Sequence, residues 1–105
     1  MLDQLQPGHW ELRLRDTAGP VRSVCVHDGR ELIQLRHPGP SCERYIVDDG
    51  DKDVTVQYTC RGRGYGRTHI RRESAQLAQI ETQGIAEALP FNFVVEARRT
   101  GDCSA

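Results

Sequence analysis

The sequence predicts a small, mostly β protein whose strands form an antiparallel meander, as a curled or barrel-like sheet. Three observations support this class. Short stretches of alternating apolar and polar residues recur along the chain, turn-forming residues separate them at nearly regular spacing, and a single segment has a pattern suited to a short helix. A chain of 105 residues has room for one core, so residues 1–105 are expected to form a single domain.

The first third of the chain is expected to hold two strands and the helix. Residues 10–15 alternate between apolar and charged side chains, which is typical of a half-buried strand. Gly and Pro in the turn at 16–20 lead into a second strand at 21–27. Asp28 and Glu31 are spaced as in a capping box, so a short helix is expected between strands two and three.

The helix is expected to end at the Pro and Gly residues of 37–40, and five more strands follow, for about seven in all. The clearest strand places Val54, Val56, Tyr58 and Cys60 on one face, which is expected to be the core face. The predicted strands are 42–47, 54–60, 67–74, 78–82 and 91–97, with turns or loops at 48–53, 62–66 and 84–90.

Four cysteines are expected to support a core that is small for the chain length. No C-x-x-C occurs among them, which argues against a zinc knuckle or a thioredoxin-type redox motif. An even number with wide gaps predicts two structural disulfides. The core-facing position of Cys60 suggests a bond that ties the C-terminal tail to a central strand. The predicted pairs are Cys25–Cys42 and Cys60–Cys103.

Disulfides persist outside the reducing cytosol, so a periplasmic or secreted location is expected. Residues 1–8 contain neither the charged nor the apolar part of a signal peptide, and no run approaches the ~20 apolar residues of a membrane span. We therefore expect that Met1 stands where a leader, or a lipid anchor in the full-length form, once preceded the domain.

Several short stretches, specific as a set, carry a resemblance to a known family. They are PGHWE (7–11), the spacing of Cys25 and Cys42, YTCRGRG (58–64), RES (72–74), QIETQGI (79–85) and EARRTGDC (96–103). With these the chain resembles the bacterial domain-of-unknown-function family 3617 over nearly its whole length. The resemblance implies an exported, disulfide-containing domain, often periplasmic or lipid-anchored. It supplies no activity, ligand or catalytic residue.

The segment 61–72 holds five arginines with Tyr65 and His69 among them, as in some RNA-binding tracts. Nucleic acid is nevertheless not expected, because the net charge of the chain is −1. A solvated hairpin face paired with neighbouring acids is the favoured interpretation. If the neighbouring acids do not offset the positive charge of this face, we expect weak, salt-sensitive binding of phosphorylated headgroups or glycans. The candidate anion-binding residues are Arg61, Arg67, His69 and Arg71.

Other chemical motifs are not convincing. GRGYG at 62–66 is not followed by a helix that could hold phosphate, and the acids of 48–53 do not have the order of an EF-hand loop. Cys25 and His27 share a strand face, but a disulfide at Cys25 removes them as a ligand pair. No catalytic residue, metal or cofactor is predicted.

Two functional hypotheses remain. The first is a non-enzymatic envelope module, binding or structural, whose partner is an envelope protein or an apolar or anionic envelope ligand. The second is a cryptic enzyme that uses His69 and Glu73 of the basic hairpin for proton transfer. The first is favoured because no catalytic constellation stands out. A concave pocket around His69 with a perturbed carboxylate would favour the second, and a filled core with a convex hairpin would favour the first.

Overall fold

The computed structural model describes residues 1–15, 21–37 and 42–103, which form one antiparallel sheet of seven strands. The strands are β1 (Gly8–Leu14), β2 (Arg22–Val26), β3 (Glu43–Asp49), β4 (Asp53–Cys60), β5 (Gly64–Ser74), β6 (Leu77–Ala86) and β7 (Leu89–Gly101). Two single 3₁₀ turns, η1 (Leu2–Gln4) and η2 (Arg30–Leu32), accompany them. The predicted mostly β, antiparallel class is confirmed. The predicted turn at 16–20 and helix end at 38–40 lie outside the described residues.

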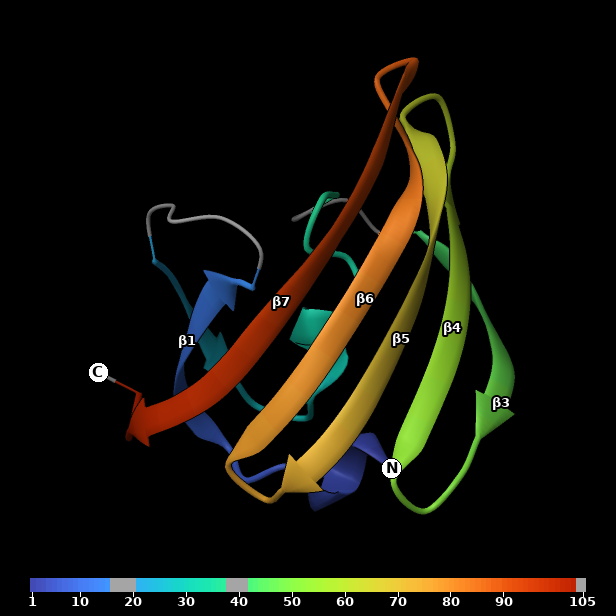
Figure 1. Ribbon diagram of the computed structural model, residues 1–105. Coiled ribbons are helices and arrows are strands. Elements are labelled where there is room, and N and C mark those ends of the chain that lie inside the picture. Colours follow the sequence, from blue (N-terminus) through green and yellow to red (C-terminus); the bar gives the residue numbers. More distant parts are fainter. Residues whose placement is uncertain (16–20, 38–41, 104–105) are drawn as a thin grey trace.

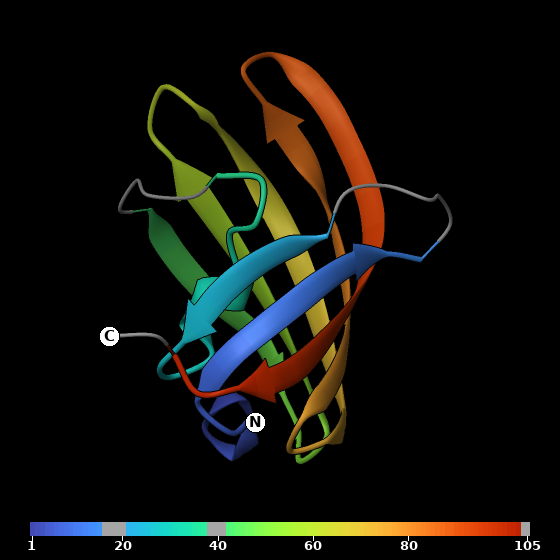
Figure 2. The same ribbon diagram turned by 90° about the vertical axis from the view of Figure 1, so that its left-hand side faces the viewer.

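The sheet has the strand order of a meander barrel that is open at one seam. Strands β3 to β7 follow one another, β1 then pairs with β7, and β2 forms the other edge. In this order every strand has the neighbours that a closed barrel would give it, except that β2 and β3 are not paired. The curl of the sheet brings the β1–β2 hairpin across from β3 and β4 (Figures 1 and 2).

The first part of the connection between the two edge strands, residues 27–37, includes η2, which is seen between the two ends of the curled sheet (Figure 2). Leu32, Ile33 and Leu35 of this connection are buried in the core. The Thr68 hydroxyl donates to the carbonyl of Ile33 at 2.6 Å, and the Arg22 guanidinium donates to that of Leu35 at 2.8 Å. Strand side chains thus use carbonyls that a longer helix would need for its own ladder. The predicted helix is wrong beyond one 3₁₀ turn.

Alternation along the strands divides the sheet into an inner, apolar face and an outer, polar face. Val54, Val56, Tyr58 and Cys60 of β4 point inward and are buried, as predicted. Strands β5, β6, β7, β1 and β2 contribute buried residues to the same core, whereas every residue of the edge strand β3 is exposed. The largest of the fully buried side chains is that of Trp10, whose indole N–H donates to the carbonyl of Gln6 at 3.0 Å.

The last three strands are longer than predicted, because two expected loops are part of the sheet. β5 already begins at Gly64, and Ala86 pairs directly with Leu89. The two residues between that pair, Glu87 and Ala88, have φ values of 51° and 69°. Positive φ at both positions is the geometry of a tight hairpin turn, usually built from Asn-Gly. Glu-Ala carries no such signal, so the turn was missed.

The four cysteines form two disulfides, but with different partners from those predicted. Cys25 is bonded to Cys103, and Cys42 to Cys60. The prediction is wrong because β1 inserts between β2 and β7. His9 of β1 faces Cys25 on one side and Gly101 on the other, so the tail beyond Gly101 meets the end of β2. Pairing between the two ends of the chain has no local sequence signal.

Candidate functional site

A row of polar side chains crosses the outer face of the sheet at its middle. The row runs from Gln57 of β4 through Arg67 and Gln83 to Asn92 of β7, each paired with the next in register. Three strand spacings of about 4.8 Å make the row roughly 14 Å long. It therefore places one guanidinium and three amides side by side. Such groups can donate and accept hydrogen bonds with one ligand.

Two adjoining hollows lie along this row. The first, of about 550 Å³, lies between Gln57, Tyr65, Arg67 and Gln83, and the second, of about 370 Å³, includes His69 and Asn92. Arg67 and Gln83 line both hollows. We call these two adjoining hollows together the outer trough. Its residues converge on Arg67.

Two glycines make up part of the floor of the first hollow. Gly66 of β5 faces Gly84 of β6, and both line the hollow with backbone atoms. A side chain at Gly84 would overlap the carbonyl oxygen of Tyr65, and one at Gly66 would overlap the ring of Tyr58. The strands can therefore approach this closely only without Cβ atoms at these two positions.

The basic residues predicted as one anion site are not equivalent in the structure. His69 lies 3.2 Å from Asp53, and Arg71 forms a 3.2 Å ion pair with Glu73. Arg61 is exposed in the β4–β5 turn and does not line the trough. Within the described ranges, Arg67 makes no ion pair. Arg61 makes none either, so Arg67 is the member of the set that combines an unpaired charge with a position in the trough.

His69 and Glu73, considered as a proton-transfer pair, lie four residues apart on one strand. At about 3.4 Å per residue this is roughly 13 Å between their backbones. The carboxylate beside His69 belongs instead to Asp53, which the sequence interpretation did not single out. Asp53 faces Arg71 across the β4–β5 pair, so the register rather than the local sequence brings it to this position.

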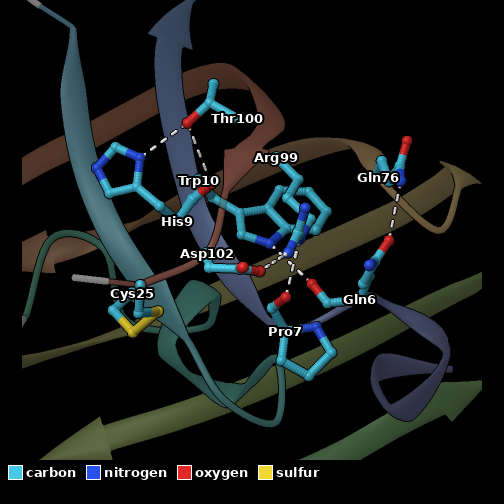
Figure 3. A network of polar contacts seen from close by, with 10 residues as sticks. Gln6, Pro7, His9, Trp10, Cys25, Gln76, Arg99, Thr100 and Asp102 are labelled. Atoms are coloured by element: carbon cyan, nitrogen blue, oxygen red, sulfur yellow. Dashed lines mark hydrogen bonds and ion pairs between the residues drawn. A yellow bond between two sulfur atoms is a disulfide. The ribbon is translucent and has the colours of Figure 1, made fainter. Parts of the chain in front are cut away.

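A second polar network ties the two ends of the chain together (Figure 3). The Arg99 guanidinium donates to the carbonyl of Pro7 at 2.9 Å and to the carboxylate of Asp102 at 2.6 Å. The imidazole of His9 lies 2.8 Å from the hydroxyl of Thr100. A Cβ atom at Gly8 would overlap the Arg99 guanidinium, which explains a glycine there. The stretches PGHWE and EARRTGDC therefore meet in a structural clamp.

A third network is buried on the inner face, and the sequence analysis missed it. The imidazole of His37 lies 2.8 Å from the hydroxyl of Tyr58 and 3.2 Å from the carbonyl of Arg63. The hydroxyls of Thr68 and Thr82 lie 2.9 Å apart. Burial raises the pKa of Tyr58, while a hydrogen bond with Thr82 and the charge of Arg36 oppose this. This network holds Ile33 and His37, which lie between β2 and β3 in the sequence, against the sheet.

Neither a metal centre nor a membrane helix is found among the residues that the structure describes. No group of three or more His, Cys, Asp or Glu side chains is placed to hold a metal ion in these ranges. In the same ranges, no helix is long and apolar enough to cross a membrane.

Fold and site together define a small, disulfide-stapled antiparallel β domain with a polar trough on its outer face. The chain belongs to the family described as "Protein of unknown function (DUF3617)", which matches residues 5–103. The resemblance seen in the sequence is thereby confirmed. Neither the curated proteins nor the solved structures include a match to this chain.

Proposed function

We propose that this domain is a non-enzymatic binding module that takes up a hydroxylated ligand with one anionic group in the outer trough. The observation that carries the proposal is the position of Arg67. Its guanidinium lines both hollows of the outer face and makes no ion pair with any described residue. An exposed Arg that is flanked in register by amides is suited to bidentate binding of a carboxylate or phosphate.

The neighbours of Arg67 favour a ligand with hydroxyl groups. Gln57 and Gln83 flank the guanidinium in register, and Asn92 continues the row. Side-chain amides offer both donors and an acceptor, as hydroxyl groups of a sugar require. Tyr65, with 55% of its surface exposed, adds an apolar ring at the rim. A sugar that carries one carboxylate or phosphate satisfies all of these groups.

The local charge limits the affinity and the number of charges on the ligand. Glu81 also lines the second hollow, and Asp53 lies beside His69. A polyanion would bring further negative charge against these acids. We therefore infer one anionic group at Arg67, and binding that weakens as salt screens it.

We further propose that the domain works outside the cytosol, as a periplasmic or secreted module. The two disulfides support this location, since such bonds persist in oxidising compartments. They also support a rigid scaffold, because they close loops with sequence separations of 78 and 18 residues. Loop-closure entropy then contributes about 4.5 and about 3 kcal/mol to stability.

A titration followed by ¹H–¹⁵N NMR tests the ligand class. The probes are glucuronate and glucose 6-phosphate, with glucose and inorganic phosphate as controls that lack either the charge or the hydroxyls. For ligands of this size, about 0.3 kcal/mol per atom predicts a Kd of about 1 mM. We expect the two sugar anions to shift the amides of Gln57, Arg67 and Gln83 more strongly than either control. Equal shifts with glucose alone, or shifts elsewhere on the sheet, would contradict the proposal.

A further inference from the structure

The two disulfides differ in how far solvent can reach them. Cys25 and Cys103 are both partly exposed, on the edge strand β2 and just beyond the end of β7. In the other bond Cys42 is also partly exposed, but Cys60 is only 2% exposed, so one of the two sulfur atoms is closed to solvent. Thiol–disulfide exchange requires a thiolate to reach a sulfur atom, so access favours the Cys25–Cys103 bond.

An imidazole stands on one side of this accessible bond. Nε2 of His27 lies 3.5 Å from Sγ of Cys25, and the His27 side chain is exposed. The two residues are two positions apart in the sequence, so the alternation of side chains along an extended strand brings them to the same side of β2. An N–H donor or a positive charge beside a sulfur lowers the pKa of its thiol. A thiol with a lower pKa is the better leaving group in exchange.

We propose that Cys25–Cys103 is a thiol-exchange site that reacts with a soluble thiol of the glutathione type. The incoming thiolate attacks Sγ of Cys103 and forms a new S–S bond there. The bond between Cys25 and Cys103 breaks, and its electron pair leaves on Sγ of Cys25, beside the imidazole of His27. The small thiol is oxidised to a mixed disulfide as Cys25 is reduced, and the Cys25 thiolate then takes its proton from water or from His27. None of these residues lines the outer trough, so the site is independent of the proposed ligand.

The sequence allows each cysteine to be followed separately, because trypsin places all four on different peptides. These peptides are SVCVHDGR, HPGPSCER, DVTVQYTCR and TGDCSA. The native protein is incubated with reduced glutathione at pH 8, samples are alkylated with iodoacetamide at intervals, and the digest is quantified by mass spectrometry. A His27→Ala variant removes the imidazole. Arg13→Ala, an exposed side chain of β1 that does not line the trough, is the control.

We expect glutathione on Cys103 and alkylation on Cys25 to accumulate about tenfold or more faster than any modification of Cys42 or Cys60. His27→Ala should slow this reaction by about threefold or more, while Arg13→Ala keeps the wild-type rate. In urea, where the fold no longer protects Cys60, the two disulfides should open at similar rates. The proposal is overturned if both bonds open together in the native protein, if glutathione is found on Cys25, or if His27→Ala has no effect.

Discussion

Cys42 lies directly opposite Cys60 at the open end of the β3–β4 hairpin, with Cα atoms 4.5 Å apart. Glu43 pairs with Thr59, so the next pair outward along the two strands is Cys42 with Cys60. The Cα separation is that of a non-hydrogen-bonded antiparallel pair, in which side chains come closest. The disulfide thus extends the hairpin register by one pair, and it fixes Cys42, the residue before β3, to the end of β4.

This register predicts the outcome of peptide mapping without reduction. Trypsin should release DVTVQYTCR linked to HPGPSCER, and SVCVHDGR linked to TGDCSA. Alkylation of any free thiols before digestion prevents exchange between the pairs. A major species that joins Cys25 to Cys42, or Cys60 to Cys103, would contradict a sheet in which β1 lies between β2 and β7.

The buried threonines lead to a second prediction, on stability. Thr68 is fully buried, and its hydroxyl donates to the carbonyl of Ile33 at 2.6 Å. Thr68→Val keeps the shape but leaves that carbonyl without its donor, which should lower the free energy of unfolding by about 1–3 kcal/mol. Urea unfolding followed by the fluorescence of Trp10, the single tryptophan, measures the change. Thr59→Val on the exposed face of β4 is the control and should be close to neutral; an equal loss in both variants would contradict the role of the Thr68 hydroxyl.

Alkaline pH tests the burial of Tyr58. Its pKa is raised in the folded state above the ordinary value of 10.0, chiefly by burial. The stabilisation from the neutral phenol is therefore complete below pH 10 and is lost as the pH rises through the folded pKa. Tyr58→Phe removes this titration but also takes the hydroxyl away from His37. The variant should be less stable than wild type at pH 8. In thermal melts, the difference in melting temperature between the two proteins should become smaller by pH 11. A difference in melting temperature that stays constant across this range would contradict the raised pKa of Tyr58.

Local patterns predicted the parts of the fold that depend on neighbouring residues. Alternation indicated the strands and the inward side of β4, because each side chain is placed by its own strand. The helix was over-predicted for a related reason. The predicted capping residues do form hydrogen bonds with the backbone. Asp28 accepts a hydrogen bond from the amide of Arg30, and Glu31 accepts one from the amide of His27. The sheet then takes up the carbonyls further on, which no local pattern reveals.

The candidate site was predicted only in part, because register rather than sequence assembles it. The outward side of Arg67 and His69 follows from the inward side of Ile70, which is buried. Three of their neighbours come from other strands, since Asp53 is beside His69, and Gln57 and Gln83 flank Arg67. Only Glu73, beside Arg71, is on the same strand. The sequence therefore suggested four equivalent cations, whereas the structure distinguishes one. The His37–Tyr58 contact was missed because 21 residues separate the two side chains.

The most direct test of the account compares two arginines in one titration. Arg67→Gln and Arg61→Gln each remove one positive charge from the exposed surface of the same hairpin, so long-range electrostatics change about equally. Binding of glucuronate is followed by ¹H–¹⁵N NMR at low salt for both variants and for the wild type. We expect Arg67→Gln to weaken binding about tenfold, as loss of a charge-assisted bidentate contact predicts, and Arg61→Gln to stay within about twofold of wild type. Equal losses in both variants, or an unchanged affinity in Arg67→Gln, would contradict the assignment of the outer trough as the ligand site.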